Sequence, residues 1–591
     1  MKGFFGKLLR IDLTEKKVRE ETLPDEVLKK YLGGKGLAAY LLLKYLPPEV
    51  DPLSADNKLI LATGPAADTI IPNASRYGVY AKAPQTGFFG ESYSGGHTAP
   101  AMKRTGYDAF MIEGASEKPV FLHISDEGVQ FYDATDIWGK ESYAAEDALL
   151  ERVKAKRAQA IVIGPAGENM VRFACIKNNY WRSAGRTGMG AVMGSKKLKG
   201  IVFSGSKKAP LADEELLKSY VKDLIKKNID SDRTKNMMGR GTPYMVTVTN
   251  SASAFPTRYW SAGTFEGWEG ISADAMRSRM DVKPKACYRC FMACGKLSKV
   301  TQGRHKGLVL EGPEYETLYA IGGLCCIDQI EEVVYLNDVC DRLGLDTISA
   351  GNVAAFAIEA GKRGKLEGMP DYGDVDGIAH LFHQIARKEG PGQILAEGVK
   401  RASEKLGLED IAVHVKGLEP AGYDPRTVTG MSLGYAVSDR GACHLRCSFY
   451  MGELRGEVPR DMVEGKAKLL IECENKNTLE DCLIICRFYQ QFIGWEGMQT
   501  IIKAITGMDL SQEELAAIAM RVTTMARLFN IREGLTKEDD TIPPRLFKEP
   551  IGPEKNLVVS KENLEVMLKE YYAIHGWDEN GIPGEAVALS L

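Results

Sequence analysis

The sequence predicts an α+β fold, with a mainly β N-terminal domain followed by two mostly helical domains. Up to about residue 205, short runs of alternating hydrophobicity are separated by glycine turns, which is typical of strands. Beyond about residue 210, hydrophobic residues recur three and four positions apart, which is typical of helices. The 591 residues can form roughly three or four domains of ordinary size. We place the predicted domains at residues 1–208, 209–410 and 411–591.

Individual elements follow from local signals. Residues 9–13, 77–82 and 120–124 alternate apolar and polar side chains or are rich in β-forming residues, and they predict strands. Asp213 can cap a helix whose apolar residues follow at helical spacing. A Ser-x-x-Glu capping box that starts at Ser511 predicts a second amphipathic helix.

Composition excludes several classes of protein. Hydrophobic content of 44% and charged content of 26% are typical of a soluble globular protein, and a net charge of −3 implies no nucleic-acid partner. No run reaches the roughly 18 to 20 apolar residues that would span a membrane. Asp12 and Glu15 interrupt the apolar start, which lacks the pattern of a signal peptide. Twelve cysteines without a secretion signal predict reduced thiols, metal ligation and a cytoplasmic location.

Four cysteines have the spacing of an iron–sulfur site. Cys287, Cys290 and Cys294 form a C-x2-C-x3-C run, and Cys486 lies almost two hundred residues later. A cubane cluster takes four thiolates, and its ligand set often combines a close run with a remote residue. The alternatives are a zinc site, which usually shows paired C-x2–4-C knuckles, and buried thiols without a metal.

Glycine-rich loops in the N-terminal part predict phosphate binding. Ser94, Gly95 and Gly96 lie between a strand-like and a helical run, and the segment 182–190 combines two arginines with several glycines. Bare backbone amides can approach a phosphate closely, and an arginine can bind its oxygens in bidentate fashion. The alternative is a pair of tight turns.

Two short acidic motifs resemble each other. Asp341 and Asp346 flank a Gly-Leu pair at the end of a predicted helix, and Asp481 precedes Cys486 with the same spacing. A carboxylate in the last turn opposes the helix dipole, so these side chains have a use other than helix stabilisation. Such a pair of motifs could hold two similar halves of a ligand. The alternative is that these carboxylates are solvated, as at most helix ends.

Taken together, these motifs resemble the tungsten-containing aldehyde ferredoxin oxidoreductases over essentially the whole chain. The resemblance begins at residues 6–14 (Gly-Lys-Leu-Leu-Arg-Ile-Asp-Leu-Thr) and ends near residues 571–577 (Tyr-Tyr-Ala-Ile-His-Gly-Trp). Between these ends, its specific segments are the cysteine run and residues 51–54, 163–169, 311–316 and 441–444.

The resemblance implies a set of cofactors. Family members hold one tungsten, less often molybdenum, between two pterin dithiolenes without a protein ligand to the metal. A [4Fe–4S] cluster beside one pterin passes electrons to a ferredoxin or to an iron–sulfur subunit, and a magnesium ion joins the pterin phosphates. Cys287, Cys290, Cys294 and Cys486 match the cluster ligands. The residues that match the pterin site are Arg76, Ser94, Gly95, Arg182, Ser183, Gly185, Asp341, Leu345, Asp346, Asp481 and Ile485, with Arg446 near the cluster in place of a frequent lysine.

The resemblance also implies the catalytic pair Glu316 and His444. Oxidation of an aldehyde to the acid adds an oxygen from water and removes two electrons, so a base must take a proton and a donor can polarise the carbonyl. A carboxylate in an apolar pocket has a raised pKa, which suits a base near neutral pH. A histidine, which titrates near neutrality, can donate or relay the proton. Taken alone, Glu316 could be a solvated helix-start residue and His444 a core histidine.

The sequence departs from the family pattern in three places. Ile484 and Ile485 replace Gly-Leu in the second acidic motif, which leaves the backbone geometry there open. Tyr93 replaces a small or polar residue at the phosphate loop, where magnesium is bound through backbone carbonyls. The Glu-x-x-His iron site of some members is missing, so we expect no such iron and leave a homodimer open.

The predicted function is oxidation of an aldehyde with transfer of electrons to ferredoxin. One alternative is a related tungsten enzyme that acts on a different low-potential substrate. The other is an iron–sulfur electron-transfer subunit, which would need neither Glu316 nor His444.

Overall fold

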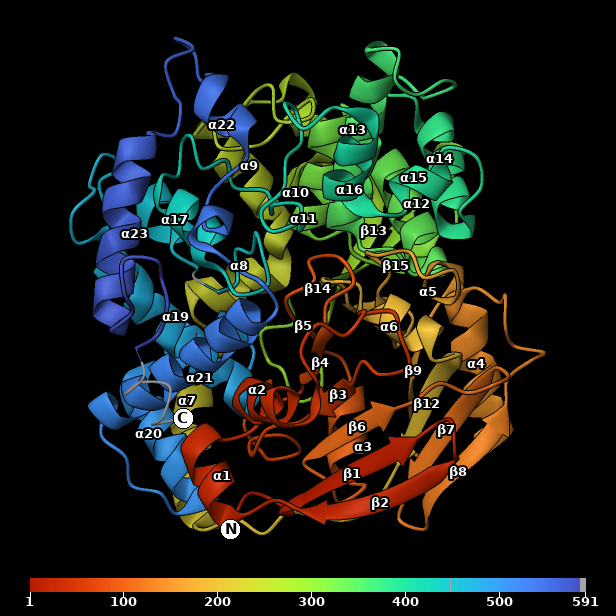
Figure 1. Ribbon diagram of the computed structural model, residues 1–591, viewed down its shortest axis with the longest axis vertical. Coiled ribbons are helices and arrows are strands. Elements are labelled where there is room, and N and C mark those ends of the chain that lie inside the picture. Colours follow the sequence, from red (N-terminus) through yellow and green to blue (C-terminus); the bar gives the residue numbers. More distant parts are fainter. Residues whose placement is uncertain (447, 585–591) are drawn as a thin grey trace.

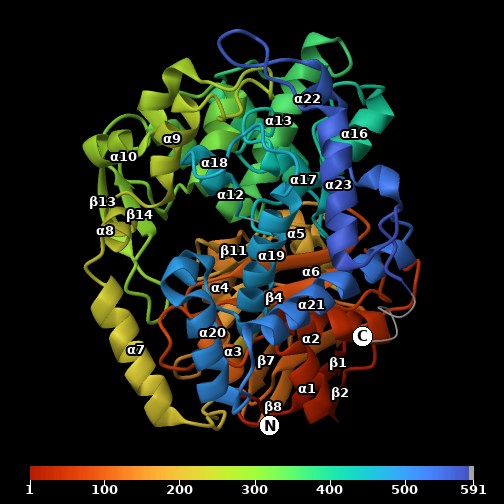
Figure 2. The same cartoon turned by 90° about the vertical axis from the view of Figure 1, so that its left-hand side faces the viewer.

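The computed structural model describes residues 1–446 and 448–584, and its N-terminal sheets lie in one half of the molecule, below most of the helices (Figures 1 and 2). The first sheet has the strand order β2-β1-β6-β3-β4-β5. Within this sheet only β1 and β6 are parallel. Its strands are β1 (Lys7–Asp12), β2 (Lys17–Thr22), β3 (Leu59–Ala62), β4 (Tyr77–Lys82), β5 (Phe89–Ser94) and β6 (Ala109–Glu113).

The second sheet has the order β11-β10-β9-β12-β7-β8 and packs face to face on the first. One hydrophobic cluster contains Ile11 and Leu61 of the first sheet together with Leu122 and Ile201 of the second. The strands of the second sheet are β7 (Val120–Ser125), β8 (Gly128–Asp133), β9 (Gln159–Val162), β10 (Ile176–Asn178), β11 (Arg182–Ala184) and β12 (Leu198–Ser204). The helices that connect the strands of these two sheets are α1 (Asp25–Tyr31), α2 (Gly34–Tyr45), α3 (Thr98–Lys103), α4 (Ser142–Val153), α5 (Pro165–Glu168) and α6 (Met189–Ser195).

The rest of the described chain is mostly helical, with one three-stranded sheet of β13 (Met280–Lys285), β14 (Gly295–Val300) and β15 (Val309–Glu311). Its first helices are α7 (Glu214–Asn228), α8 (Asp232–Gly239), α9 (Met245–Ser251), α10 (Ala273–Arg279), α11 (Tyr315–Thr317), α12 (Ile330–Leu343), α13 (Thr347–Lys362), α14 (Val375–Arg387), α15 (Gly392–Leu395) and α16 (Gly398–Leu406). The later ones are α17 (Gly430–Val437), α18 (Tyr450–Leu454), α19 (Lys466–Leu483), α20 (Gln490–Thr506), α21 (Gln512–Arg532), α22 (Pro544–Lys548) and α23 (Lys561–His575).

The α+β class predicted from the sequence is confirmed, and so are the local signals. The three predicted strands correspond to β1, β4 and β7. The Asp213 carboxylate accepts a hydrogen bond from the Leu216 amide at 2.9 Å and caps α7. The capping box of Ser511 and Glu514 starts α21.

The C-terminal helices cover the outer face of the first sheet. Residues of α2, α19, α20 and α21 form one hydrophobic cluster with Ile60, Tyr80 and Met111 of that sheet. This packing brings the end of α19, and with it Cys486, onto the N-terminal domain although it lies some four hundred residues later in the sequence.

Both acidic motifs end their helices with the same backbone turn. At the end of α12, Gly344 has a φ of 78°, and the amides of Gly344 and Leu345 both donate to the Cys340 carbonyl. At the end of α19, Ile484 has a φ of 66°, and its amide and that of Ile485 both donate to the Glu480 carbonyl. The departure from Gly-Leu therefore leaves the backbone turn unchanged. A β-branched residue in this conformation is costly, and Ile484 regains stability by being buried.

Each of these helix ends packs against glycines of the N-terminal domain. A methyl group added at Gly164 would clash with the Leu343 carbonyl at the end of α12. One added at Gly64 would lie 2.5 Å from the Leu483 carbonyl oxygen at the end of α19, and Gly34 contacts the carbonyl of Asp481 in the same way. The absence of side chains here lets the two motifs approach the sheets closely.

We expect Gly64→Ala to cost about 1–3 kcal/mol of stability, because the Leu483 carbonyl must move to accept the methyl group. Gly239→Ala is the matched control, since an added Cβ there meets no atom within 4 Å. Thermal unfolding of both variants, purified under the same anaerobic conditions, measures the difference. Equal unfolding temperatures for the two variants would contradict the close packing at Gly64.

Candidate functional site

The four predicted cluster cysteines come together at the boundary between domains. Cys287, Cys290 and Cys294 lie in the loop between β13 and β14, and Cys486 follows the end of α19. Burial raises the pKa of Cys294, and the charges of Glu314, Cys486 and Cys287 add to this effect, so these thiols lie within electrostatic reach of one another.

Residues of the N-terminal domain close this group of thiols from the other side. The Arg76 guanidinium donates from Nη2 to Cys486 Sγ at 3.1 Å. A Cβ added at Gly95 would lie 3.1 Å from Cys287 Sγ, so the glycine backbone approaches this thiol closely. Within residues 1–446 and 448–584, no set of three or more His, Cys, Asp or Glu side chains could hold a metal ion.

The glycine-rich loops meet at the ends of β5 and β11. Ser94 Oγ donates to Asn178 Oδ1 at 2.6 Å, and Asn178 Nδ2 donates to the Gly95 carbonyl at 3.0 Å. Arg182 forms an ion pair with Glu311, and its side chain passes beside Gly96. Gly185 has open space beside it, because the nearest atoms to an added Cβ lie 3.9 Å away.

The first acidic motif is bound to this loop region through a buried lysine. Lys177 Nζ donates to Asp341 Oδ1 at 2.5 Å and to Ser183 Oγ at 2.6 Å. Burial raises the pKa of Asp341 to about 6, although the Lys177 ammonium opposes this shift. Asp346 caps α13 and forms an ion pair with Arg186 at 3.0 Å, and Leu345 between the two carboxylates is buried.

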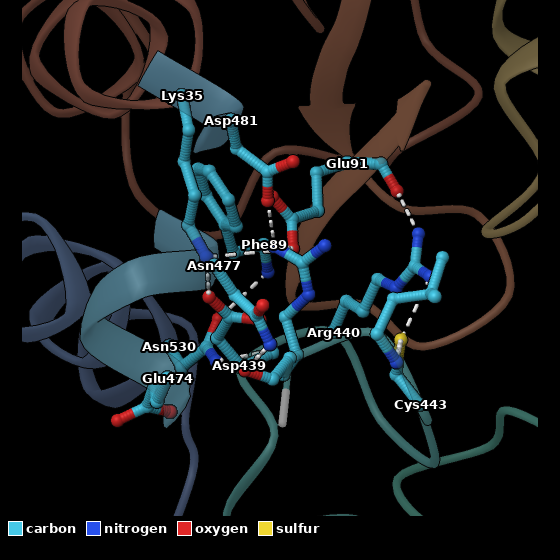
Figure 3. A network of polar contacts seen from close by, with 12 residues as sticks. Lys35, Phe89, Glu91, Asp439, Arg440, Cys443, Glu474, Asn477, Asp481 and Asn530 are labelled. Carbon is cyan, nitrogen blue, oxygen red and sulfur yellow. Dashed lines mark hydrogen bonds and ion pairs between the residues drawn. The ribbon is translucent and has the colours of Figure 1, made fainter. Parts of the chain in front are cut away.

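The second acidic motif belongs to a larger network of buried charges (Figure 3). Arg446 Nη1 lies 2.8 Å from Asp481 Oδ2 and 2.5 Å from Glu91 Oε1, and Arg487 also pairs with Asp481. Lys35 Nζ joins the network from α2 through Asp439, at 2.5 Å. Ile485 of the same motif is buried. Asp481 and Arg446 were predicted as site residues, whereas Glu91, Lys35, Asp439 and Arg487 were not.

Several buried arginine N–H groups in this region have no hydrogen-bond partner among the described residues. They are Nε of Arg440, Nε and Nη2 of Arg446, and Nε and Nη1 of Arg487. Buried donors without acceptors are costly, and their occurrence together indicates a site for an anionic ligand rich in acceptor atoms.

Glu316 and His444 lie beside each other, as the resemblance implies. Glu316 Oε1 is 3.5 Å from His444 Nε2 and has no hydrogen-bond partner, while Oε2 accepts from the Gly422 amide at 2.9 Å. Burial raises the pKa of Glu316 to about 8, although the Gly422 amide and Arg186 oppose the shift. The side chain is therefore not a solvated residue at a helix start.

The expectation that His444 titrates near neutrality is wrong. Burial lowers the pKa of His444 well below its usual value, and the nearby guanidinium groups of Arg440 and Arg186 lower it further. The imidazole is thus neutral around pH 7 and can serve as a hydrogen-bond donor or acceptor without carrying charge.

Cys443 is a residue of this site that the sequence reasoning missed. Its Sγ accepts hydrogen bonds from Arg440 Nη2 at 2.8 Å and from the Leu445 amide at 3.2 Å (Figure 3). Burial opposes ionisation of the thiol, but the charges of Arg440 and Arg446 outweigh it and lower its pKa to about 7. The signal in the sequence was an arginine three residues before a cysteine that precedes His444.

We expect Asp481→Asn to cost about 3–5 kcal/mol, because it leaves two buried guanidinium groups without their shared carboxylate. Asp136→Asn, which breaks an exposed pair with Arg152, is the control and should leave stability unchanged. Chemical unfolding of the two variants and the wild type measures the difference. A wild-type unfolding midpoint for Asp481→Asn would refute the importance of this buried pair.

No helix in the described part of the chain has the length and apolar character needed to cross a bilayer. In overall fold the chain is similar to the active-site complex BamBC of benzoyl coenzyme A reductase in complex with 1,5-dienoyl-CoA. That match has a TM-score of 0.84 at 24% identity and covers 100% of this chain and 97% of that one.

Sequence comparison gives the family. The model for the N-terminal domain of aldehyde ferredoxin oxidoreductase matches residues 8–205, and the model for its domains 2 and 3 matches residues 219–591. The chain is 38% identical to the tungsten-containing aldehyde ferredoxin oxidoreductase of Thermococcus kodakarensis, over 99% of this chain and 98% of that protein. It is 33% identical to the WOR-like subunit of the aliphatic sulfonate oxidoreductase of Pyrococcus furiosus, over 100% and 97% of the two chains. The two acidic motifs, the cysteine run and these matches agree, and the chain belongs to the aldehyde ferredoxin oxidoreductase family.

Proposed function

We propose that the protein oxidises an aldehyde to the carboxylic acid at a bis-pterin tungsten centre and passes the electrons through a [4Fe–4S] cluster to a ferredoxin. The observation that carries the proposal is the pair of Glu316 and His444, with a buried carboxylate oxygen that has no partner. An electron-transfer subunit has no use for such a pair, so the arrangement favours an enzyme.

The residues present fit the pterin cofactor. The partnerless N–H groups of Arg440, Arg446 and Arg487 would donate to acceptor atoms of a bound pterin. Ser94, Gly95, Arg182, Ser183 and Gly185 would hold its phosphates, together with a magnesium ion, and Arg76 would lie between phosphate and cluster. The two acidic motifs would each bind one pterin, with Asp341 and Asp481 at equivalent positions. When bound, the tungsten centre supplies oxygen transfer and accepts two electrons.

The four cysteines fit a cubane better than a single ion. They come from two loops, they interact electrostatically, and they form no set that could hold one metal ion among the described residues. A cubane keeps its four thiolates farther apart than one ion does, because each thiolate binds a different iron.

Glu316 would act as the base of the reaction. The Gly422 amide fixes one carboxylate oxygen, which leaves Oε1 to accept a proton from water or its adduct. Its pKa of about 8 means that the carboxylate form becomes abundant as the pH rises through that value. The neutral His444 ring, 3.5 Å away, would donate a hydrogen bond to the substrate carbonyl oxygen.

A second candidate is a related tungsten enzyme with another substrate. The full-length similarity to a subunit of the aliphatic sulfonate oxidoreductase supports this second candidate. The stacked rings of Tyr423 and Tyr450, 3.8 Å apart and next to His444, would then select the substrate. Comparing turnover of aliphatic aldehydes, aromatic aldehydes and sulfonates by the purified enzyme distinguishes the two candidates.

Replacing Cys290 with alanine should remove the cluster, because a cubane needs four thiolates. We expect loss of the paramagnetic signal of the reduced cluster and of ferredoxin reduction, measured by EPR and iron analysis of anaerobically purified protein. Cys325→Ala is the control, since Cys325 is buried elsewhere in the helical core. Stoichiometric zinc without iron in the wild type would contradict the cluster assignment.

Replacing Glu316 with glutamine should lower kcat/KM about 10²- to 10⁴-fold, because the amide cannot accept the proton. In the wild type, kcat/KM should rise with pH through about 8, and the variant should lose this rise. Tungsten and iron contents should stay normal in the variant. Wild-type turnover by a fully loaded Glu316→Gln enzyme would show that the base lies elsewhere.

A further inference from the structure

The loop that carries the cysteine run borders a surface cavity of about 390 Å³. Tyr288, the residue after Cys287, forms part of its wall. The other lining residues come from α3 and the residues at both its ends, and from the start of β9 and the segment before it: His97, Pro100, Ala101, Arg104, Arg157 and Gln159. The cavity therefore borders the residue that follows the first predicted cluster ligand in the sequence.

Tyr288 is held firmly in place at this surface. Its amide donates to the Gly96 carbonyl at 3.0 Å, which joins the cysteine loop to the glycine loop. Its hydroxyl accepts from Arg104 Nη2 at 3.2 Å, and its ring meets His97 edge to face at 6.3 Å. The ring is partly exposed, so it can contact a partner without reorganising.

The surface around Tyr288 is basic although the whole chain carries a net charge of −3. Arg157 is exposed and has no ion-pair partner among the described residues. Arg289 is exposed as well, and its guanidinium lies 5.4 Å from the centre of the Tyr288 ring. Two more exposed cations, Lys154 and Lys156, come just before Arg157 in the sequence, and the described residues that line the cavity include no carboxylate. Arg104 forms an ion pair with Asp68, so the positive charge of this surface comes mainly from Arg157, Arg289 and the two lysines.

We propose that the Tyr288 surface, formed by His97, Arg104, Arg157, Tyr288 and Arg289, is the docking site of the acidic ferredoxin that receives the electrons. The inference rests on the proposed function, which supplies the partner. Oxidation of one aldehyde to the acid releases two electrons, so two ferredoxins that each accept one electron would be reduced for each aldehyde oxidised, and Cys287 would help to hold the cluster that supplies them at this surface. Complexes for electron transfer are small and depend on charge complementarity, which a basic rim around one aromatic side chain provides.

The test uses the holoenzyme and a purified acidic [4Fe–4S] ferredoxin. The variants are Arg157→Asn, Arg289→Asn and the two combined, because asparagine tolerates the left-handed backbone that both arginines have, with φ of 59° and 55°. The control is Lys405→Glu, an exposed lysine on α16, which lies in the upper half of the molecule whereas α3 lies in the lower half (Figures 1 and 2). Ferredoxin binding is measured by calorimetry at several salt concentrations, and aldehyde oxidation is measured with ferredoxin and with benzyl viologen.

We expect the double variant to bind ferredoxin about tenfold or more weakly, with a shallower dependence on salt. Its kcat/KM for ferredoxin should fall by the same factor, while iron content and the rate with benzyl viologen stay at wild-type values. Wild-type ferredoxin affinity in the double variant, or an equal loss in Lys405→Glu, would overturn the proposal. An enzyme that oxidises no aldehyde with the dye would refute the proposed function instead, and the binding data would still decide on the Tyr288 surface.

Discussion

The site depends on the two buried ion pairs that Arg446 forms with Glu91 and Asp481. They join a strand of the N-terminal sheet, the last turn of α19 and the loop that carries Cys443 and His444. A buried cation between two carboxylates is stable only while all three are present, because each isolated charge would be costly in this environment. The network therefore fixes the loop that carries Cys443 and His444, and the cysteine after α19, relative to the same strand, and Lys35 reinforces it from α2.

The local parts of the fold could be predicted from the sequence, because they depend on neighbouring residues. Asp213 and Ser511 cap the helices that their side chains predicted. Gly344 ends α12, as expected for a glycine that follows an amphipathic run. The presence of Glu316 and His444 in one place followed from resemblance alone. Their 3.5 Å separation depends on packing between segments more than a hundred residues apart, which no local pattern encodes.

The electrostatics of the site were the least predictable part. Lys35 and Asp439 pair across 404 positions of sequence, and the lowered pKa of His444 is caused first by its burial and then by arginines that fold in around it. The ordinary pKa of histidine suggested that His444 titrates near neutrality, whereas burial and the surrounding cations keep it neutral. The same cations favour the thiolate of Cys443, whose importance is visible only once Arg440 and Arg446 are placed. The assignment of the cofactor ligands and the domain boundaries at 208 and 410 stay predictions.

The raised pKa of Glu316 has a consequence for the direction of the chemistry. Near pH 7 this carboxyl group is mostly protonated, and it lies next to a neutral imidazole in a largely buried pocket. A reaction and its reverse use the same groups with their proton roles exchanged. Under the proposed function, acidification therefore supplies the proton donor that reduction of a carboxylic acid to the aldehyde requires. In a cell with strongly reduced ferredoxin and abundant carboxylic acid, the same pair of side chains would then serve to produce aldehydes rather than to consume them.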